Sequence, residues 1–157
     1  GKVWSGILGI DVGAKRWGFY VLNHKEESGI AVDSGFAFDT VSRLSFRNAI
    51  GALVRNAKPD VVVVARPNTG GRKGNYMTAG KQWEYIGILN MVCEDFDVQS
   101  EIITDLSARA LVFADCGIKG VKSKEKIAPI LAEKWGIVDP DVGDAFVNAK
   151  YKDILLE

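Results

Sequence analysis

Three short apolar runs, separated by polar turns, open the chain. The first covers residues 7–10 and ends at Asp11, the second covers 17–22, and the third covers 30–38. Runs of this length that contain β-branched and aromatic residues, bounded by glycine and polar residues, are typical of β-strands. Short turns between consecutive strands favour antiparallel pairing. These runs therefore predict a three-stranded antiparallel meander.

A later run of four valines, residues 61–64, has no polar alternation. A strand of this kind is usually buried on both faces, as in the centre of a sheet covered by helices. Residues 98–103 predict a fifth strand. Helical spacing of apolar residues predicts helices at 42–57, 77–96, 107–114 and 123–135 and a last helix with Asp139 as N-cap and Pro140 at its first position. We expect Asp105 or Ser107 to cap the helix at 107–114.

The order of these elements predicts an α/β fold. We expect one mixed five-stranded sheet with helices on both faces, in which strands 1, 2 and 3 form the meander and strands 4 and 5 are parallel. The chain of 157 residues shows no internal repeat, linker or low-complexity segment. We therefore expect a single domain over residues 1–157.

Composition narrows the classes of function. Apolar residues make up 47% of the chain and charged residues 25%, which is typical of a soluble globular protein rather than a disordered one. No window reaches the roughly 18 apolar residues that a membrane-spanning helix needs, so we expect no membrane partner. Cys93 and Cys116 lack the spacing of a zinc or redox motif, which predicts reduced thiols and a cytoplasmic location.

The positive charges gather in three places although Lys plus Arg balances Asp plus Glu at 20 each. A nucleic-acid-binding protein with no net charge must concentrate its positive field in this way. The alternative is that these are ordinary solvated loops. The candidate nucleic-acid-binding residues, which the resemblance described below makes DNA-binding, are Lys15, Arg16, Arg66, Arg72, Lys73, Lys119, Lys122 and Lys124.

The candidate catalytic groups are acidic side chains. Asp11 ends the first strand among glycines that leave its surroundings open, and strand 4 beside strand 1 would bring residue 65 next to it. Asp141 and Asp144 are three residues apart, hence neighbours on one face of the last helix. Converging acids suit Mg²⁺ or Mn²⁺, and two ions roughly 3.5–4 Å apart would promote phosphodiester hydrolysis. The alternatives are a hairpin that happens to hold an aspartate, and acids that favour the helix dipole.

Three blocks of the sequence resemble one family in their order and spacing. They read ILGIDVGAKRWGFYVLN, PDVVVVA and KSKEKIAPILAEKWGIVDPDVGDAFVNA. Together they resemble the RuvC-like branch of the ribonuclease H superfamily, of a divergent or phage type. The resemblance implies a ribonuclease H-like fold and a Holliday junction resolvase, a homodimer that nicks four-way DNA junctions symmetrically with Mg²⁺ or Mn²⁺, two ions per active site.

The resemblance also assigns roles to single residues. It makes Asp11, Asp141 and Asp144 catalytic metal ligands, and it places Lys122 near the scissile phosphate. The second acid of the family, a glutamate, falls at Ala65, and a methyl group cannot bind a metal. We interpret Ala65 as a deliberate Glu→Ala change that leaves the nuclease inactive.

Other interpretations of these residues stay open. The protein could be naturally impaired at position 65, or Glu84 could replace the missing acid. The residues that open the junction would be Tyr76, or Arg72 with Lys73. The helix at 77–96 is the predicted dimer surface.

Three other classes of protein compete with the resolvase. A YqgF-like nuclease of the same superfamily would act on RNA. A non-catalytic protein would bind DNA structures without cutting. The actin-like ATP-binding fold shares the strand–turn–strand phosphate loop, but it normally needs two such domains.

Overall fold

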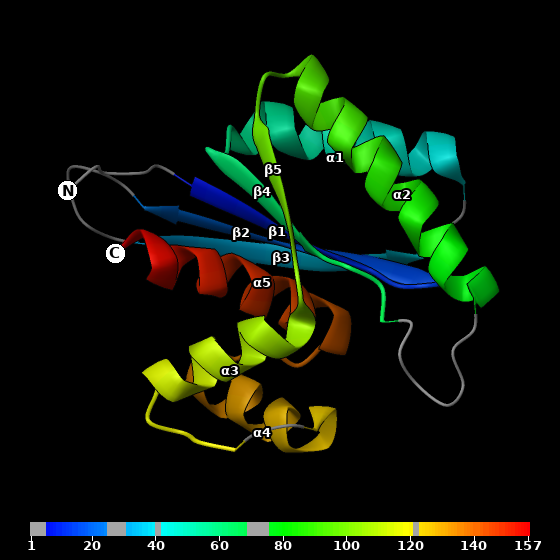
Figure 1. The fold of residues 1–157 in the computed structure, drawn as a ribbon. Helices are drawn as coiled ribbons and strands as arrows, with labels where there is room; N and C mark the ends of the chain where they lie inside the picture. The colour runs from blue at the N-terminus through cyan, green and yellow to red at the C-terminus, as the bar shows by residue number, and fades with distance from the viewer. Residues whose placement is uncertain (1–5, 25–30, 40–41, 69–75, 121–122) are drawn as a thin grey trace.

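A computed structural model of the chain describes residues 6–24, 31–39, 42–68, 76–120 and 123–157. Its centre is a five-stranded sheet in the order β3-β2-β1-β4-β5 (Figure 1). The strands are β1 (Gly6–Val12), β2 (Arg16–His24), β3 (Ala31–Asp39), β4 (Val61–Ala65) and β5 (Gln99–Ile103). The helices are α1 (Arg43–Ala57), α2 (Tyr76–Asp95), α3 (Asp105–Asp115), α4 (Lys124–Trp135) and α5 (Pro140–Leu156).

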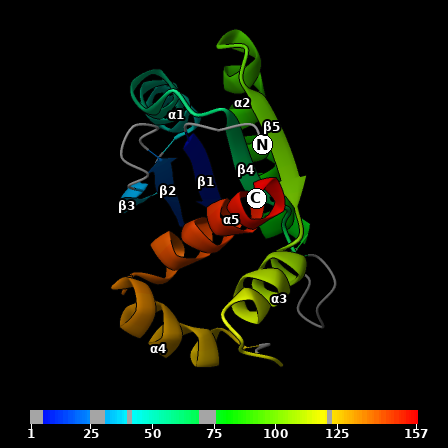
Figure 2. The same ribbon diagram turned by 90° about the vertical axis from the view of Figure 1, so that its left-hand side faces the viewer.

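The sheet confirms the predicted fold class. β1, β2 and β3 pair antiparallel as a meander, and β4 pairs parallel with both β1 and β5. Helices α1 and α2 cover one face, whereas α5, α3 and α4 lie on the other, as two views at right angles show (Figures 1 and 2). None of the described helices is both long and apolar enough to span a membrane.

Alternation along the strands sends side chains to two separate cores. Leu8 and Ile10 of β1 join a cluster with side chains of α1 and α2, while Ile7 belongs to the cluster under α5. The four valines of β4 are all buried and divide between both clusters. This confirms that the valine run forms a central, covered strand.

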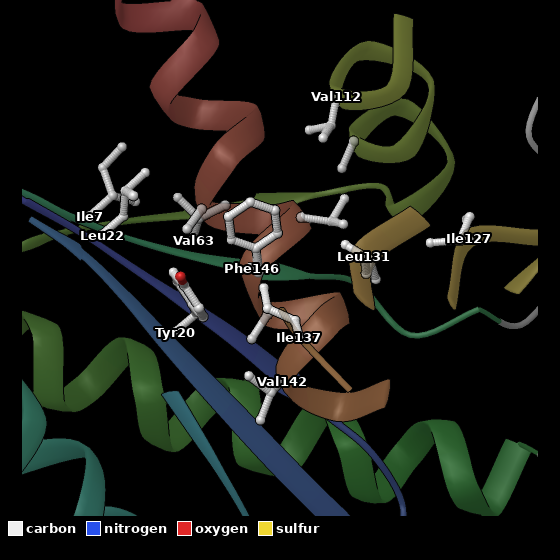
Figure 3. Close-up of a cluster of buried hydrophobic side chains, with 14 of the residues drawn as sticks. Ile7, Tyr20, Leu22, Val63, Val112, Ile127, Leu131, Ile137, Val142 and Phe146 are labelled. Atoms are coloured by element: carbon white, nitrogen blue, oxygen red, sulfur yellow. The ribbon is translucent and has the colours of Figure 1, made fainter. Parts of the chain in front are cut away.

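The second core is centred on Phe146 of α5. Figure 3 shows its ring among Tyr20, Val63 and Ile137, and the Tyr20 and Phe146 rings meet edge to face at a centroid distance of 4.9 Å. Leu131 of α4 packs into the same cluster. This cluster fixes how α5 crosses the sheet.

Glycines on three neighbouring strands give α5 its path across the sheet. A Cβ atom at Gly9 would overlap the backbone carbonyl oxygen of Ala145, and one at Gly18 would lie 2.8 Å from the carbonyl oxygen of Asp141. A Cβ atom at Gly35 on β3 would lie 3.0 Å from the Cγ1 atom of Val142 on α5. The helix backbone therefore lies directly on the strands, which brings the first turns of α5 to the end of β1.

The helix ends follow the expected capping chemistry except at α3. Asp139 caps α5, since its carboxylate accepts hydrogen bonds from the backbone N–H groups of Asp141 and Val142 at 2.9 and 3.2 Å, and Pro140 is the first helical residue. The predicted cap of α3 at Asp105 or Ser107 is wrong. Thr104 is the N-cap there, because its hydroxyl accepts from the Ser107 N–H group.

Candidate active site

The candidate site lies at the carboxyl ends of parallel strands. Ile10 of β1 is paired with Val64 of β4, so one residue further along both strands Asp11 lies beside Ala65. Ala65 is in turn paired with Ile103 of β5. In open α/β sheets, ligands bind in the crevice beyond such strand ends.

A cleft of about 140 Å³ opens at this point. Asp11 and Ala65 line it from the sheet, and Asp144 lines it from α5. These three positions come from segments far apart in the chain, and the fold brings them together as the sequence predicted. The other lining residues are Val12, Arg66, Pro67, Asn68, Gln82, Asp105, Arg109, Val147 and Asn148.

Two amide side chains hold the backbone on either side of Asp11. The buried Asn148 of α5 donates a hydrogen bond to the carbonyl oxygen of Ile10 at 3.0 Å. Gln82 of α2 donates to the carbonyl oxygen of Val12 at 2.9 Å. Because these donors hold the residues before and after Asp11 from opposite faces of the sheet, they restrict the backbone that carries its carboxylate. Neither amide had been assigned a role from the sequence.

Asp141 lies outside this cleft. Its carboxylate is 3.4 Å from Nη1 of Arg16, whose Nη2 is 2.9 Å from the carboxylate of Asp139. Partial desolvation acts to raise the pKa of Asp139, but hydrogen bonds from the Val142 N–H group and from Arg16 outweigh it and hold that pKa below its ordinary value. The hydrogen bond to Asp139 raises the pKa of Arg16. Arg16, Asp139 and Asp141 thus form an ion-pair network at the start of α5.

The donor set decides how well the site fits a divalent metal. Asp11 and Asp144 offer the carboxylate oxygens that Mg²⁺ and Mn²⁺ prefer. The methyl group of Ala65, which stands between them in sequence order, offers none. No group of three acidic, histidine or cysteine side chains able to hold a metal occurs within the described ranges. The two carboxylates fit a hard cation, to which Ala65 contributes no ligand.

Glu84 does not replace the missing acid. Its side chain is half exposed on α2 and pairs with Arg43 of α1 at 3.8 Å. It is not among the residues that line the cleft. The hypothesis that Glu84 substitutes at position 65 is therefore wrong for this arrangement.

Two charged residues of the cleft were missed in the sequence. Asp105 lies two positions beyond Ile103, at the start of α3, and Arg109 follows one helical turn later. The Nη2 atom of Arg109 lies 3.3 Å from the Asp105 carboxylate. Asp11 was singled out because it is an acid at the end of a predicted strand. Asp105 also follows a predicted strand, but it was interpreted as a helix cap and so was not considered as a site residue.

The predicted DNA-binding residues fall into three groups. Lys15 and Lys119 are exposed in loops, and Arg66 is exposed at the edge of the cleft. Arg16 is half exposed and engaged with acids. Arg72, Lys73 and Lys122 lie outside the described residues, as do the side chains of Tyr76 and Lys124.

Comparison with known proteins identifies the fold. No family model and no curated protein sequence matches the chain. A solved complex of Thermus thermophilus RuvC with a Holliday junction substrate superposes with a TM-score of 0.75 at 14% identity, covering 97% of this chain and 94% of that one. Fowlpox virus resolvase with Holliday junction DNA gives 0.61 at 14% identity, covering 97% and 99%. The yeast mitochondrial Holliday junction resolvase Ydc2 gives 0.61 at 13% identity, covering 94% and 78%.

These superpositions cover nearly the whole chain, so the resemblance extends beyond the three sequence blocks. The chain has the ribonuclease H-like fold of RuvC and of these resolvases. The predicted resemblance is confirmed at the level of the fold. At 13–14% sequence identity, the shared fold does not carry the substrates of these proteins over to this chain.

Proposed function

We propose that this chain binds four-way DNA junctions and is a junction-resolving nuclease whose missing metal ligand is at Ala65. One observation carries the proposal. Asp11 and Asp144 share a cleft with Ala65 at the ends of two parallel strands, on a fold that the chain shares with three solved Holliday junction resolvases.

Asp11 and Asp144 would hold Mg²⁺ or Mn²⁺ in this cleft, and two ions would need the further ligand that a glutamate at position 65 supplies. Such ions would stabilise the attacking and leaving oxygens of phosphodiester cleavage, which would leave 5′-phosphate and 3′-hydroxyl ends. The protein itself contributes by holding the two aspartates in place. Asn148 and Gln82 hold the backbone around Asp11, and the buried face of α5 holds Asp144 opposite it.

With Ala65 in place, the chain binds its substrate without cutting it. We interpret this residue as a deliberate Glu→Ala change in an otherwise intact nuclease, because Asp11 and Asp144 line the same cleft as Ala65. The alternative of a natural, non-catalytic DNA-structure-binding protein rests on the same observation. The sequence of the parent gene separates the two, since an alanine codon there would refute the deliberate change.

The proposed enzyme is a homodimer through α1 and α2, which extends the sequence prediction for 77–96. Leu44 and Met91 are 59% and 67% exposed, and together with Ile88 they line a groove between the two helices. Arg47 and Asp95 lie in the same groove. Apolar residues beside charges of both signs suit an isologous interface, in which the same surface meets its copy.

A binding assay tests the proposed function. The labelled four-way DNA junction, a linear duplex with the same sequences and a four-way RNA junction would each be titrated with the chain in EDTA and in Ca²⁺. We expect tighter binding of the DNA junction than of either competitor, with strong salt dependence because phosphate contacts release counterions. Equal affinity for junction and duplex would refute the proposal. A preference for RNA would favour the YqgF-like alternative.

A further inference from the structure

Arg109 is an unusually buried cation in the wall of the candidate active site. It is 9% exposed, and it lines the same cleft as Asp11, Ala65 and Asp144. Arginine is almost never buried to this degree unless it has a charged partner. Helix α3 places it there because Thr104 caps the helix directly after β5, so Arg109 lies just over one turn from Asp105, the first residue of the helix.

The guanidinium of Arg109 is only partly satisfied by the part of the chain that the structure describes. Its Nη2 atom donates to the carboxylate of Asp105 at 3.3 Å, which is long for a charge-assisted hydrogen bond. Arginine carries five N–H donors. The Nε and Nη1 groups have no protein acceptor among the residues that the structure describes. Since buried polar groups are nearly always paired, these donors indicate a ligand with acceptor oxygens in the cleft.

The charges of the cleft indicate what kind of ligand this is. Under the proposed function, a backbone phosphate enters the cleft that Asp11 and Asp144 line. Arg109 provides positive charge at this position from the protein itself. A planar guanidinium fork matches the geometry of two phosphate oxygens.

We propose that Arg109 binds a backbone phosphate of the nucleic acid inside the cleft, with Asp105 holding one edge of its guanidinium. This inference rests on the proposed function, because it assigns a contact within the same site. Arg109 is thereby a substrate-binding residue next to the reacting phosphate, separate from the exposed lysines of the loops. The alternative is that Arg109 has no role in substrate binding and only offsets the charge of Asp105.

The test compares Arg109→Gln with the unmodified chain on the four-way DNA junction in EDTA, over a range of salt concentrations. Loss of a charged phosphate contact should weaken binding about tenfold or more and reduce the slope of log K against log salt by about 0.9. Arg55→Gln is the matched control, since Arg55 is exposed on α1 and stacks over Phe96. We expect it to change neither quantity.

Arg109→Lys keeps the test decisive if the glutamine variant does not fold. Lysine retains the charge but lacks the fork, so the expected result is about tenfold weaker binding with an unchanged salt slope. Unchanged affinity in a folded variant would overturn the inference while leaving the junction preference of the unmodified chain intact. If the unmodified chain shows no junction preference, the proposed function fails instead, and the contact assigned to Arg109 fails with it.

Discussion

Asp11 and Ala65 lie side by side on neighbouring parallel strands, one residue beyond the paired residues Ile10 and Val64. Asp144 lines the same cleft from α5. In this arrangement, a side chain longer than alanine at position 65 would point into the space that the two aspartates share. The methyl group of Ala65 offers no metal ligand at this position.

The two acids of α5 should contribute unequally to cleavage. In the Ala65→Glu background, Asp144→Asn should reduce junction cleavage by at least about 100-fold, because loss of even an outer partner of a metal ligand costs 10–100-fold. Asp141→Asn should cost less than about tenfold, since Asp141 lies outside the cleft and pairs with Arg16. Single-turnover cleavage rates with Mg²⁺ measure both. An equal loss in the two variants would contradict the structure.

Gly9 and Gly80 should respond in opposite ways to alanine. Gly9→Ala places a methyl group on the Ala145 carbonyl oxygen and should destabilise the fold by about 3 kcal/mol, at the upper end for overpacking. Gly80 is exposed on α2, with nothing within 4 Å of an added Cβ atom. Gly80→Ala should stabilise the protein by about 1 kcal/mol. Urea unfolding measures both changes, and a tolerated Gly9→Ala would show that α5 does not lie directly on β1.

Asp139 should stabilise the fold in a pH-dependent way. Asp139→Ala removes the N-cap of α5 and should cost about 1 kcal/mol at neutral pH. Asp139→Asn keeps the cap but loses the charge that pairs with Arg16, so it should cost less. The pKa of Asp139 is lowered in the folded state, and the contribution of its charge is therefore present above the unfolded pKa of about 3.9.

That contribution is lost as the pH falls through the lowered folded pKa. The stability difference between the unmodified chain and Asp139→Asn should therefore be constant above about pH 5 and shrink below about pH 4. Urea unfolding at a series of pH values measures it. A difference that grows on acidification would have the wrong sign for a carboxylate stabilised by Arg16.

The groove between α1 and α2 should be the dimer surface. Met91→Lys puts a charge into the groove that Leu44 and Ile88 also line, and it should convert a dimer to a monomer in sedimentation velocity. Val138→Lys is the control, since Val138 is 83% exposed between α4 and α5, on the other side of the sheet. A monomeric unmodified chain at micromolar concentration would contradict the proposed dimer.

Much of this fold was predictable because its signals are local. The valine run of β4, the three apolar runs of the meander and the Asp139–Pro140 start of α5 each follow from short-range preferences. The meeting of Asp11 with position 65 also follows, because parallel neighbours end at the same edge of a sheet. These predictions needed no knowledge of how helices cross the sheet.

The parts that local signals do not determine depend on long-range packing. Asp141 and Asp144 share one side of a helix, but which of them enters the cleft depends on where α5 crosses the strands, and close contacts at Gly9 and Gly18 determine that crossing. The role of Arg109 was hidden for the same reason. Nothing local in the helix 107–114 indicates that its first turns close the cleft.

Cleavage of a labelled four-way DNA junction with Mg²⁺, by this chain and by its Ala65→Glu variant, tests the central claim most directly. We predict that the chain binds the junction but leaves it uncut, and that the glutamate restores paired, symmetric nicks. Asp11→Asn in the Ala65→Glu background should abolish them again. If the glutamate variant binds the junction no better than linear duplex and cuts neither, position 65 is not the missing ligand and the proposed resolvase activity is refuted.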